Sequence, residues 1–173
     1  VLLAFLDERP VFLREYASKS YGILSYYISK SIVETPFQLA FPIIFSLIIY
    51  WATGMTNEAD RFFIFVLITL LLVFFATSFG FFLGCLFKEA STATTSVVLF
   101  SMPMIILAGF YVNIDDVPVY MRWMIYLNPI RYAMEAYLRN EFQGNDRYEI
   151  KIYDNYNYNV GLLECLLILI AYG

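Results

Sequence analysis

Histidine is absent from this sequence, cysteine occurs only twice, and charged residues make up 15% of its 173 residues. With no histidine, and with Cys85 and Cys165 in separate apolar runs, we expect no cluster of metal-binding side chains. The phosphate loop GxxxxGKS or GxxxxGKT and the nucleophile elbow are also missing, so we expect no catalytic residue in this chain. Basic patches interleaved with aromatic residues are missing as well, which argues against nucleic acid as a partner.

Hydrophobic residues are plentiful instead. They make up 61% of the chain, with 17 phenylalanines and 15 tyrosines. Soluble domains carry roughly 25% charged residues and about 45–50% apolar ones. A soluble fold would have to bury nearly all of these aromatic rings in one core, whereas a lipid bilayer solvates them directly. The composition therefore favours a membrane protein.

Three stretches without charge, at 35–57, 62–87 and 90–114, have 23, 26 and 25 residues. A helix that crosses a bilayer needs about 20 mostly apolar residues. A fourth apolar run begins at Val160. The runs are continuous and do not alternate with period two, which predicts helices and not barrel strands. We therefore predict an all-α, integral membrane helical bundle with about four long transmembrane helices, a multi-pass protein of the plasma membrane or an internal membrane.

The distribution of charge divides the chain into segments. The first apolar tail and the last apolar run both reach the ends of the sequence, so we expect a fragment of a longer protein that is cut within two membrane helices. The charge balance between the connections does not decide which side is cytoplasmic. In order, we predict the end of one membrane helix at 1–6, a polar connection at 7–20, a membrane helix at 22–53, a short connection at 54–61, a membrane helix at 62–87, a tight turn at 88–90, a membrane helix at 91–112, a long polar connection at 113–159 and the start of a membrane helix at 160–173.

The first polar connection has the pattern of an amphipathic helix. Helical spacing brings Val11, Phe12 and Glu15 near one another and places Arg14 on a neighbouring face. Such a helix can lie on the membrane surface or dock into another domain. A solvated connecting loop is an equally good interpretation of the residues alone.

Two ionisable residues, Lys30 and Glu34, lie four residues apart on one face of a predicted membrane helix, and Gln38 continues that face. Charges at membrane depth are costly unless they are paired or face the interior of a protein. The pair could take part in a polar relay between helices, or it could simply stabilise a helix interface.

A short helix is predicted at 128–139 within the long connection. Asn128 has the chemistry of an N-cap, and Pro129 suits the first helical position. Because the segment is short and carries charge, we expect it to re-enter the membrane or pack over the bundle mouth. Before it, Pro103 and Gly109 loosen the end of the preceding helix.

Together these segments resemble the transmembrane domain of G-subfamily ABC exporters, of the White and pleiotropic-drug-resistance type. The resemblance covers essentially the whole chain in order and spacing. It is carried by the segments 8–15 (ERPVFLRE), 26–30 (YYISK), 34–36 (ETP), 109–113 (GFYVN), 118–123 (PVYMRW), 128–135 (NPIRYAME) and 140–142 (NEF).

The resemblance implies a six-helix domain, of which this chain holds the end of helix 2 through the start of helix 6. It implies that 7–20 is a cytosolic connection with the coupling helix, whose contact residues are Val11, Phe12, Arg14 and Glu15. The segment 113–159 is then the large external loop. The implied partners are a nucleotide-binding domain, a second transmembrane domain and a hydrophobic small-molecule or lipid substrate. ATP and magnesium are implied only for the nucleotide-binding domain, and no cofactor for this chain.

The resemblance also implies which residues act in transport. In this family two transmembrane domains enclose a cavity lined by helices 2 and 5, and the matching positions of helix 5 are Val98, Met102 and Ile105. Phe110 and Tyr111 match the apolar gate, where many relatives have leucine. The pair Lys30 and Glu34 would form a polar relay beside the coupling helix.

The expected function is therefore ATP-driven export of lipids, sterols or other hydrophobic compounds. The residues alone leave two other classes open. One is a non-transporting scaffold or assembly subunit that acts through its external loop. The other is a channel-forming bundle, which is less favoured because no polar stripe runs along any predicted span.

Overall fold

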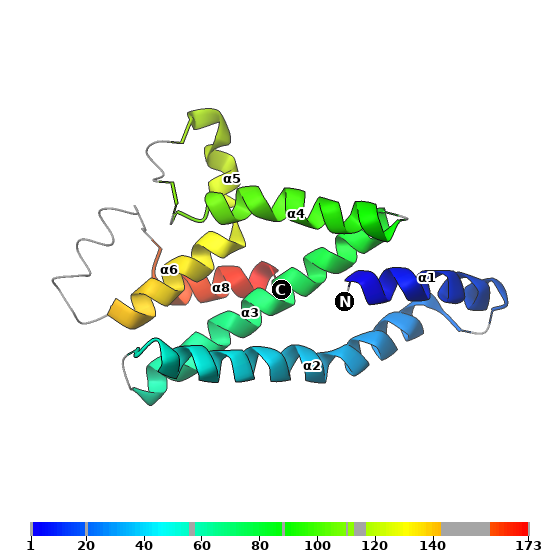
Figure 1. Cartoon of the computed structure of the whole chain (residues 1–173), viewed down its shortest axis with the longest axis horizontal. Helices are drawn as coiled ribbons and strands as arrows, with labels where there is room; N and C mark the ends of the chain where they lie inside the picture. Colours follow the sequence, from blue (N-terminus) through cyan, green and yellow to red (C-terminus); the bar gives the residue numbers. More distant parts are fainter. Residues whose placement is uncertain are drawn as a thin grey trace.

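The structure is a computed structural model that describes residues 2–19, 21–55, 58–87, 89–109, 111–112, 117–142 and 160–172. These residues form α-helices and one 3-10 turn, with no strand among them (Figure 1). The prediction of an all-α membrane helical bundle is confirmed. The elements are α1 (Leu2–Ala17), α2 (Ile23–Ala52), α3 (Ala59–Leu86), α4 (Ala90–Ile106), η2 (Val119–Met121), α5 (Arg122–Tyr126), α6 (Pro129–Phe142) and α8 (Leu162–Tyr172).

Helices α2 and α3 are long and apolar enough to cross a membrane, with 30 and 28 residues. At a rise of about 1.5 Å per residue, each exceeds the roughly 30 Å of a bilayer's hydrocarbon core. The two helices pack against each other (Figure 1). The ring of Tyr50, near the end of α2, lies 5.2 Å from that of Phe62 and 5.6 Å from that of Phe65, near the start of α3. These ring contacts hold the end of α2 against the start of α3.

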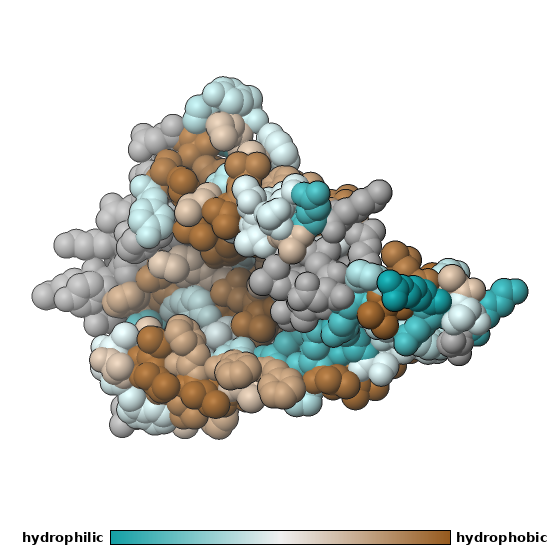
Figure 2. All heavy atoms as spheres, turned by 45° about the vertical axis from the view of Figure 1, so that its right-hand side comes forward, coloured by the Kyte–Doolittle hydropathy of each residue, from teal (hydrophilic) through white to brown (hydrophobic). Residues whose placement is uncertain are grey.

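Much of the surface of α2 remains uncovered by the described residues. Figure 2 shows hydrophobic side chains along the lower edge of the molecule, where α2 lies. Lipid or further protein can cover such a surface. The large apolar residues exposed on the second half of α2 include Phe37, Phe41, Ile44, Phe45, Ile48 and Trp51.

Helix α1 runs continuously from Leu2 to Ala17, so one helix joins the predicted apolar tail to most of the predicted polar connection. A change from apolar to charged residues does not itself end a helix, because leucine, alanine, glutamate and arginine all favour helical backbone. The helix ends where Lys19 adopts a φ of 56°. This left-handed conformation is a common helix terminator.

Helix α4 ends at Ile106, six residues before the predicted end at Val112. Pro103 in the last turn and Gly109, with a φ of 93°, explain the difference. Proline disturbs the helix around it, and a left-handed glycine reverses the backbone just beyond. Leu107 follows the helix directly and packs in a small core with Val117 and Ile125 of the connection.

The main core lies where α3, α6 and α8 meet. Ala133 and Ala136 of α6 are fully buried, and such small side chains let the helix backbones approach closely. Thr69 of α3 and Tyr137 of α6 share a hydrogen bond of 2.8 Å between their hydroxyl oxygens. The buried members of the core are Ile68, Tyr132, Ala133, Ala136, Cys165, Leu166 and Leu169.

Asn128 joins the end of α4 to the start of α6. Its Oδ1 accepts a hydrogen bond of 3.1 Å from the Ile130 N–H, and Pro129 is the first helical residue, which confirms the predicted N-cap. Its Nδ2 also donates to the Met104 carbonyl at 2.6 Å. That carbonyl belongs to the last turn of α4, where helix carbonyls lack intrahelical partners.

Replacing Asn128 with alanine should therefore destabilise the protein. The variant loses a helix cap and leaves the Met104 carbonyl without its amide donor, a loss of about 1–3 kcal/mol. The measurement is the thermal melting of detergent-solubilised protein. Asn128→Ser is the matched control: its hydroxyl oxygen can cap the helix, but its shorter side chain loses the amide donor, so it should melt between the wild type and the alanine variant. Equal melting of all three proteins would contradict the assignment.

Candidate functional site

A charged cluster links α1 to α2. Lys30 Nζ contacts Glu8 Oε2, and it lies 3.6 Å from Glu34 Oε1. The Tyr26 hydroxyl donates to the same Glu8 oxygen at 3.1 Å. The hydrogen bond from Lys30 lowers the pKa of Glu8 below its ordinary value. The spacing along one helix predicted the pair of Lys30 and Glu34. It could not predict the contact with Glu8, because Glu8 lies on a different helix and the contact depends on how the two helices pack.

Phe12 and Glu15 turn toward α2. The ring of Phe12 lies 4.4 Å from the ring of Tyr26, centroid to centroid. Glu15 accepts a hydrogen bond from the Tyr21 hydroxyl, and this bond raises the pKa of Tyr21 to about 12. Two of the four predicted coupling residues thus hold α1 against the start of α2.

The other two, Val11 and Arg14, lie on the exposed part of α1. Val11 is 54% exposed, and the Arg14 side chain is also exposed. An apolar and a cationic side chain are therefore available on this helix for a further domain. The coupling role of all four residues stays a prediction.

The predicted cavity residues lie on an exposed face of α4. Val98, Met102 and Ile105 are 50%, 55% and 42% exposed. Val98 and Met102 line one shallow hollow of about 600 Å³, and Ile105 does not. The rest of the hollow is formed by Thr94, Thr95, Leu99, Pro103 and Ile106.

The two threonines of this hollow use their hydroxyl protons within α4. Thr94 Oγ1 donates to the Ala90 carbonyl at 2.8 Å, and Thr95 Oγ1 donates to the Ser91 carbonyl at 2.9 Å. None of the described residues that line the hollow is charged. It is therefore suited to an apolar surface, whether of a ligand or of another helix.

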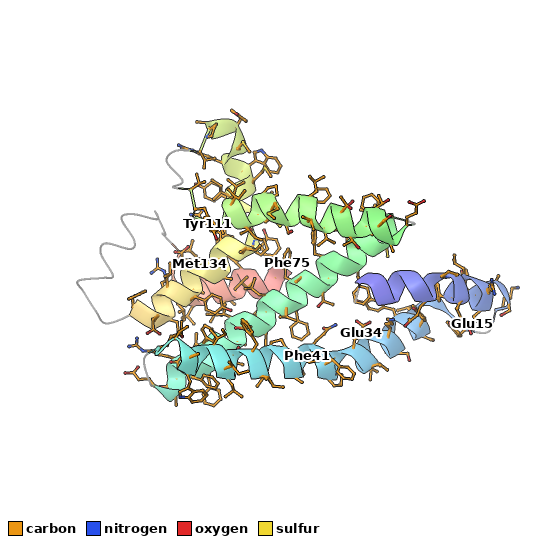
Figure 3. The ribbon with its side chains drawn as sticks, in the orientation of Figure 1. Glu15, Glu34, Phe41, Phe75, Tyr111 and Met134 are labelled. Carbon is orange, nitrogen blue, oxygen red and sulfur yellow. The ribbon has the colours of Figure 1, made fainter. Side chains whose placement is uncertain are left out.

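The predicted gate is described only in part, because Phe110 lies outside the described residues. Tyr111 is 69% exposed beyond the end of α4. Figure 3 shows Glu15 near the right-hand end of the molecule and Tyr111 left of its centre, beside the end of α4.

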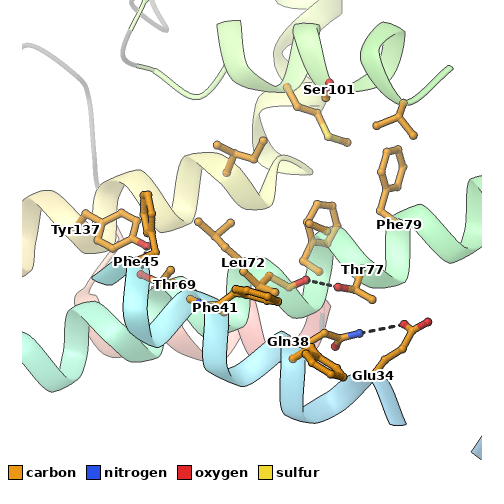
Figure 4. A pocket seen from close by; sticks show the side chains of 18 residues that line it. Glu34, Gln38, Phe41, Phe45, Thr69, Leu72, Thr77, Phe79, Ser101 and Tyr137 are labelled. Carbon is orange, nitrogen blue, oxygen red and sulfur yellow. Dashed lines mark hydrogen bonds between the residues drawn. The ribbon is translucent and has the colours of Figure 1, made fainter. Parts of the chain in front are cut away.

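A larger groove of about 970 Å³ lies between α2, α3, α4 and α6 (Figure 4). Glu34 lies in its wall, and Gln38 Nε2 donates to the Glu34 carboxylate at 3.4 Å. The sequence analysis missed this groove, although phenylalanines recur every fourth residue along α2. The aromatic lining residues are Phe37, Phe41, Phe45, Phe75, Phe79 and Tyr137.

Comparison with known proteins assigns these helices to a family. Residues 1–142 match the ABC-2 type transporter family. The chain belongs to this family. It is 34% identical over 141 residues to Protein white of Ceratitis capitata, a match that covers 82% of this chain and 21% of that protein. It is 32% identical over 154 residues to ABC transporter G family member 2 of Arabidopsis thaliana, covering 87% of this chain and 20% of that protein.

These relatives confirm the resemblance to the G subfamily. A further relative, the ABC transporter ATP-binding protein/permease wht-1 of Caenorhabditis elegans, is 30% identical over 135 residues, which cover 78% of this chain and 20% of that protein. The chain thus spans about one fifth of the length of the relatives that it matches. It is a membrane part of an ABC-2 type transporter, and it is a multi-pass integral membrane protein.

This ABC-2 domain also contains a buried polar contact between α6 and the start of α8. Glu135 is fully buried, and its Oε1 accepts hydrogen bonds from the Val160 N–H at 2.8 Å and from Arg139 Nη2 at 3.1 Å. Burial raises the pKa of Glu135, while the bonds from Val160 and Arg139 act in the opposite direction. One carboxyl group thus connects α6 to the start of α8. The segment 143–159, which joins them in the sequence, lies outside the described residues.

Proposed function

We propose that this domain is the membrane-spanning part of an ATP-driven exporter of lipids, sterols or other hydrophobic compounds. The observation that carries the proposal is the exposed apolar face of α4 in a chain of the ABC-2 type transporter family. In the proposal this face meets a second transmembrane domain, and Val98, Met102 and Ile105 line the cavity between them.

The chemistry of that face supports a hydrophobic substrate. The described residues of the hollow on α4 are all uncharged, and its threonines use their hydroxyl protons on their own backbone. A strongly polar substrate would lose its hydration there without gaining partners, which is costly. An apolar substrate would instead gain about 25 cal/mol for each Å² removed from water.

The contacts of α1 supply a route for coupling. Val11 and Arg14 would contact a nucleotide-binding domain, which lies outside this chain and which would hold ATP and magnesium. Movement of α1 would reach α2 through the Phe12–Tyr26 ring contact and the Lys30 cluster, because both join the helices directly. The transmembrane helices would then rock as rigid bodies, with Phe110 and Tyr111 opening as the gate.

The direct test uses the full-length protein in lipid vesicles. ATP hydrolysis should rise when hydrophobic compounds are added, and the compounds that stimulate it should move across the membrane only when ATP is present. A protein that hydrolyses ATP but moves none of a broad panel of lipids, sterols and aromatic compounds would contradict the proposal.

Lys30 offers a sharper test of coupling. Lys30→Met removes the cation between two carboxylates and keeps an unbranched side chain, so we expect export to fall roughly tenfold at a given ATPase rate. Lys30→Arg is the matched control and should retain most export. The ratio of substrate moved to ATP hydrolysed is the measurement, and an unchanged ratio in Lys30→Met would exclude the relay.

A further inference from the structure

We propose that Arg61 is a positioning residue for the proposed substrate cavity: acting through α6, it fixes the place of the last turn of α4. The inference rests on the proposed function, since that function assigns the cavity to α4. Helix α6 contacts both α3 and α4. In Figure 1 it lies between the start of α3 and the end of α4, on the side where these two helices diverge.

One end of α6 is bound to α3. Arg61 Nη1 donates hydrogen bonds to the carbonyls of Glu141 at 2.7 Å and of Asn140 at 3.3 Å. In return, Asn140 Nδ2 donates to the Arg61 carbonyl at 2.8 Å. Carbonyls in the last turn of a helix lack partners within that helix, and the negative end of the helix dipole attracts cations. Arg61 of α3 thus caps the C-terminal end of α6.

The other end of α6 is bound to α4. Asn128 caps the first turn of α6, and its Nδ2 donates to the Met104 carbonyl at 2.6 Å. Met104 lies between Met102 and Ile105 in the sequence, so the same turn of α4 carries two of the proposed cavity residues. A movement of the start of α6 will therefore move the cavity face.

Between these two ends, small buried residues form a point about which α6 can pivot on α3. Ala133 and Ala136 pack in one core with Ile68. Along α6, about 10 Å separates Ala133 from Asn140, and about 8 Å separates it from Asn128. Contact at one point leaves two helices free to change their crossing angle, whereas a second contact at a distance fixes that angle. Arg61 supplies the second contact.

Two further contacts near Arg61 differ in what they can do. The Tyr137 hydroxyl shares a hydrogen bond of 2.8 Å with Thr69, so it holds the same arm of α6, three residues nearer to the pivot than Asn140. Glu58 accepts a hydrogen bond of 2.6 Å from Arg61 Nε and is 59% exposed. The bonds from Arg61 to α6 come from Nη1, so they do not require Glu58.

Distances between spin labels on the full-length transporter in lipid vesicles test the proposal. The native cysteines are first replaced by serine. Labels are then attached at Phe63→Cys on α3 and at Ile106→Cys at the end of α4, positions whose native side chains are 69% and 46% exposed. Arg61→Met removes the donors and keeps an unbranched side chain. It should at least double the width of the distance distribution, because α6 can then pivot and carry the end of α4 with it.

Three further variants separate this role from a general loss of packing. Glu58→Gln removes the exposed ion pair and keeps the bonds to α6, so its distribution should be as narrow as that of the wild type. Arg61→Met combined with Tyr137→Phe should be broader than Arg61→Met alone. Asn128→Ser releases α4 from α6, so adding Arg61→Met to it should widen the distribution no further.

An Arg61→Met distribution as narrow as that of the wild type would overturn the proposal, as would a further widening when Arg61→Met is added to Asn128→Ser. In transport, Arg61→Met should lower the amount of substrate moved per ATP hydrolysed about fivefold, and Arg61→Lys should restore most of it. An unchanged ratio would overturn the role in the cavity. If the wild type exports none of the tested compounds, the proposed function fails, but the distances still decide whether Arg61 positions α4.

Discussion

Replacing Met102 by arginine should abolish export while leaving the amount of transporter in the membrane unchanged. Met102 is 55% exposed on the uncharged face of α4 and lines its hollow. An arginine enclosed between two such faces would lose its hydration and find no carboxylate among the residues of the hollow. At membrane depth this costs about 3 kcal/mol or more, equivalent to a loss of at least roughly hundredfold.

Met102→Leu is the matched control for volume and apolar character, and such exchanges usually cost less than about 1.5 kcal/mol. Its export should stay close to the wild-type rate. Export is measured in membrane vesicles and normalised to the transporter that reaches the membrane. If Met102→Arg transports normally, Met102 does not face the cavity, and the proposed arrangement of α4 must be abandoned.

Replacing Glu135 by alanine should cause the largest loss of stability. Glu135 is fully buried and accepts hydrogen bonds from Val160 and Arg139. Removing this acceptor leaves a buried N–H donor without its partner and takes one contact from Arg139, which costs about 1–3 kcal/mol for each neutral donor and more for a charged one. The melting temperature of the detergent-solubilised protein should fall by several degrees, with α8 loosened from α6. A variant that melts with the wild type would show that this contact contributes nothing.

Glu135→Gln keeps the size and shape of the side chain but cannot ionise, so it tests the contribution of the proton alone. Because burial raises the pKa of Glu135 above its ordinary 4.5, the folded protein holds this proton more tightly than the unfolded chain does. The stability of the wild type relative to Glu135→Gln should therefore be greatest below pH 4.5 and decline as the pH rises through the folded-state pKa. Melting curves across this range provide the measurement, and a relative stability that grows with pH would contradict the sign.

The sequence was most informative where a single segment decides the structure. The uncharged stretches at 35–57 and 62–87 exceed the about 20 apolar residues that a membrane-spanning helix needs, and α2 and α3 lie there. Asn128 followed by Pro129 predicted a helix start, since capping depends on neighbouring residues only. The end of α4 was placed too late, because hydrophobicity continues past the proline and the glycine that end the helix.

Features that require two or more segments were less accessible. The Glu8 contact to Lys30 joins residues 22 positions apart on different helices, and no spacing within one helix predicts it. The groove has walls from four helices, so its existence depends on how they pack. The spacing of Phe37, Phe41 and Phe45 shows that these rings lie on one side of a helix, but it does not show which other helices they face. The roles assigned to Val98, Met102 and Ile105 stay predictions for the same reason.

The inward hydrogen bonds of Thr94 and Thr95 have a consequence for selectivity. Because both hydroxyl groups donate to backbone carbonyls of α4, neither can donate a hydrogen bond to a molecule in the hollow, and each threonine offers its methyl group there. An apolar surface rejects a molecule that carries one extra hydroxyl by only about a hundredfold, whereas a site built around donors discriminates far more strongly. Molecules that bind there would be selected by their size and shape and not by hydrogen bonds. Chemically unrelated compounds of similar shape should therefore compete with one another.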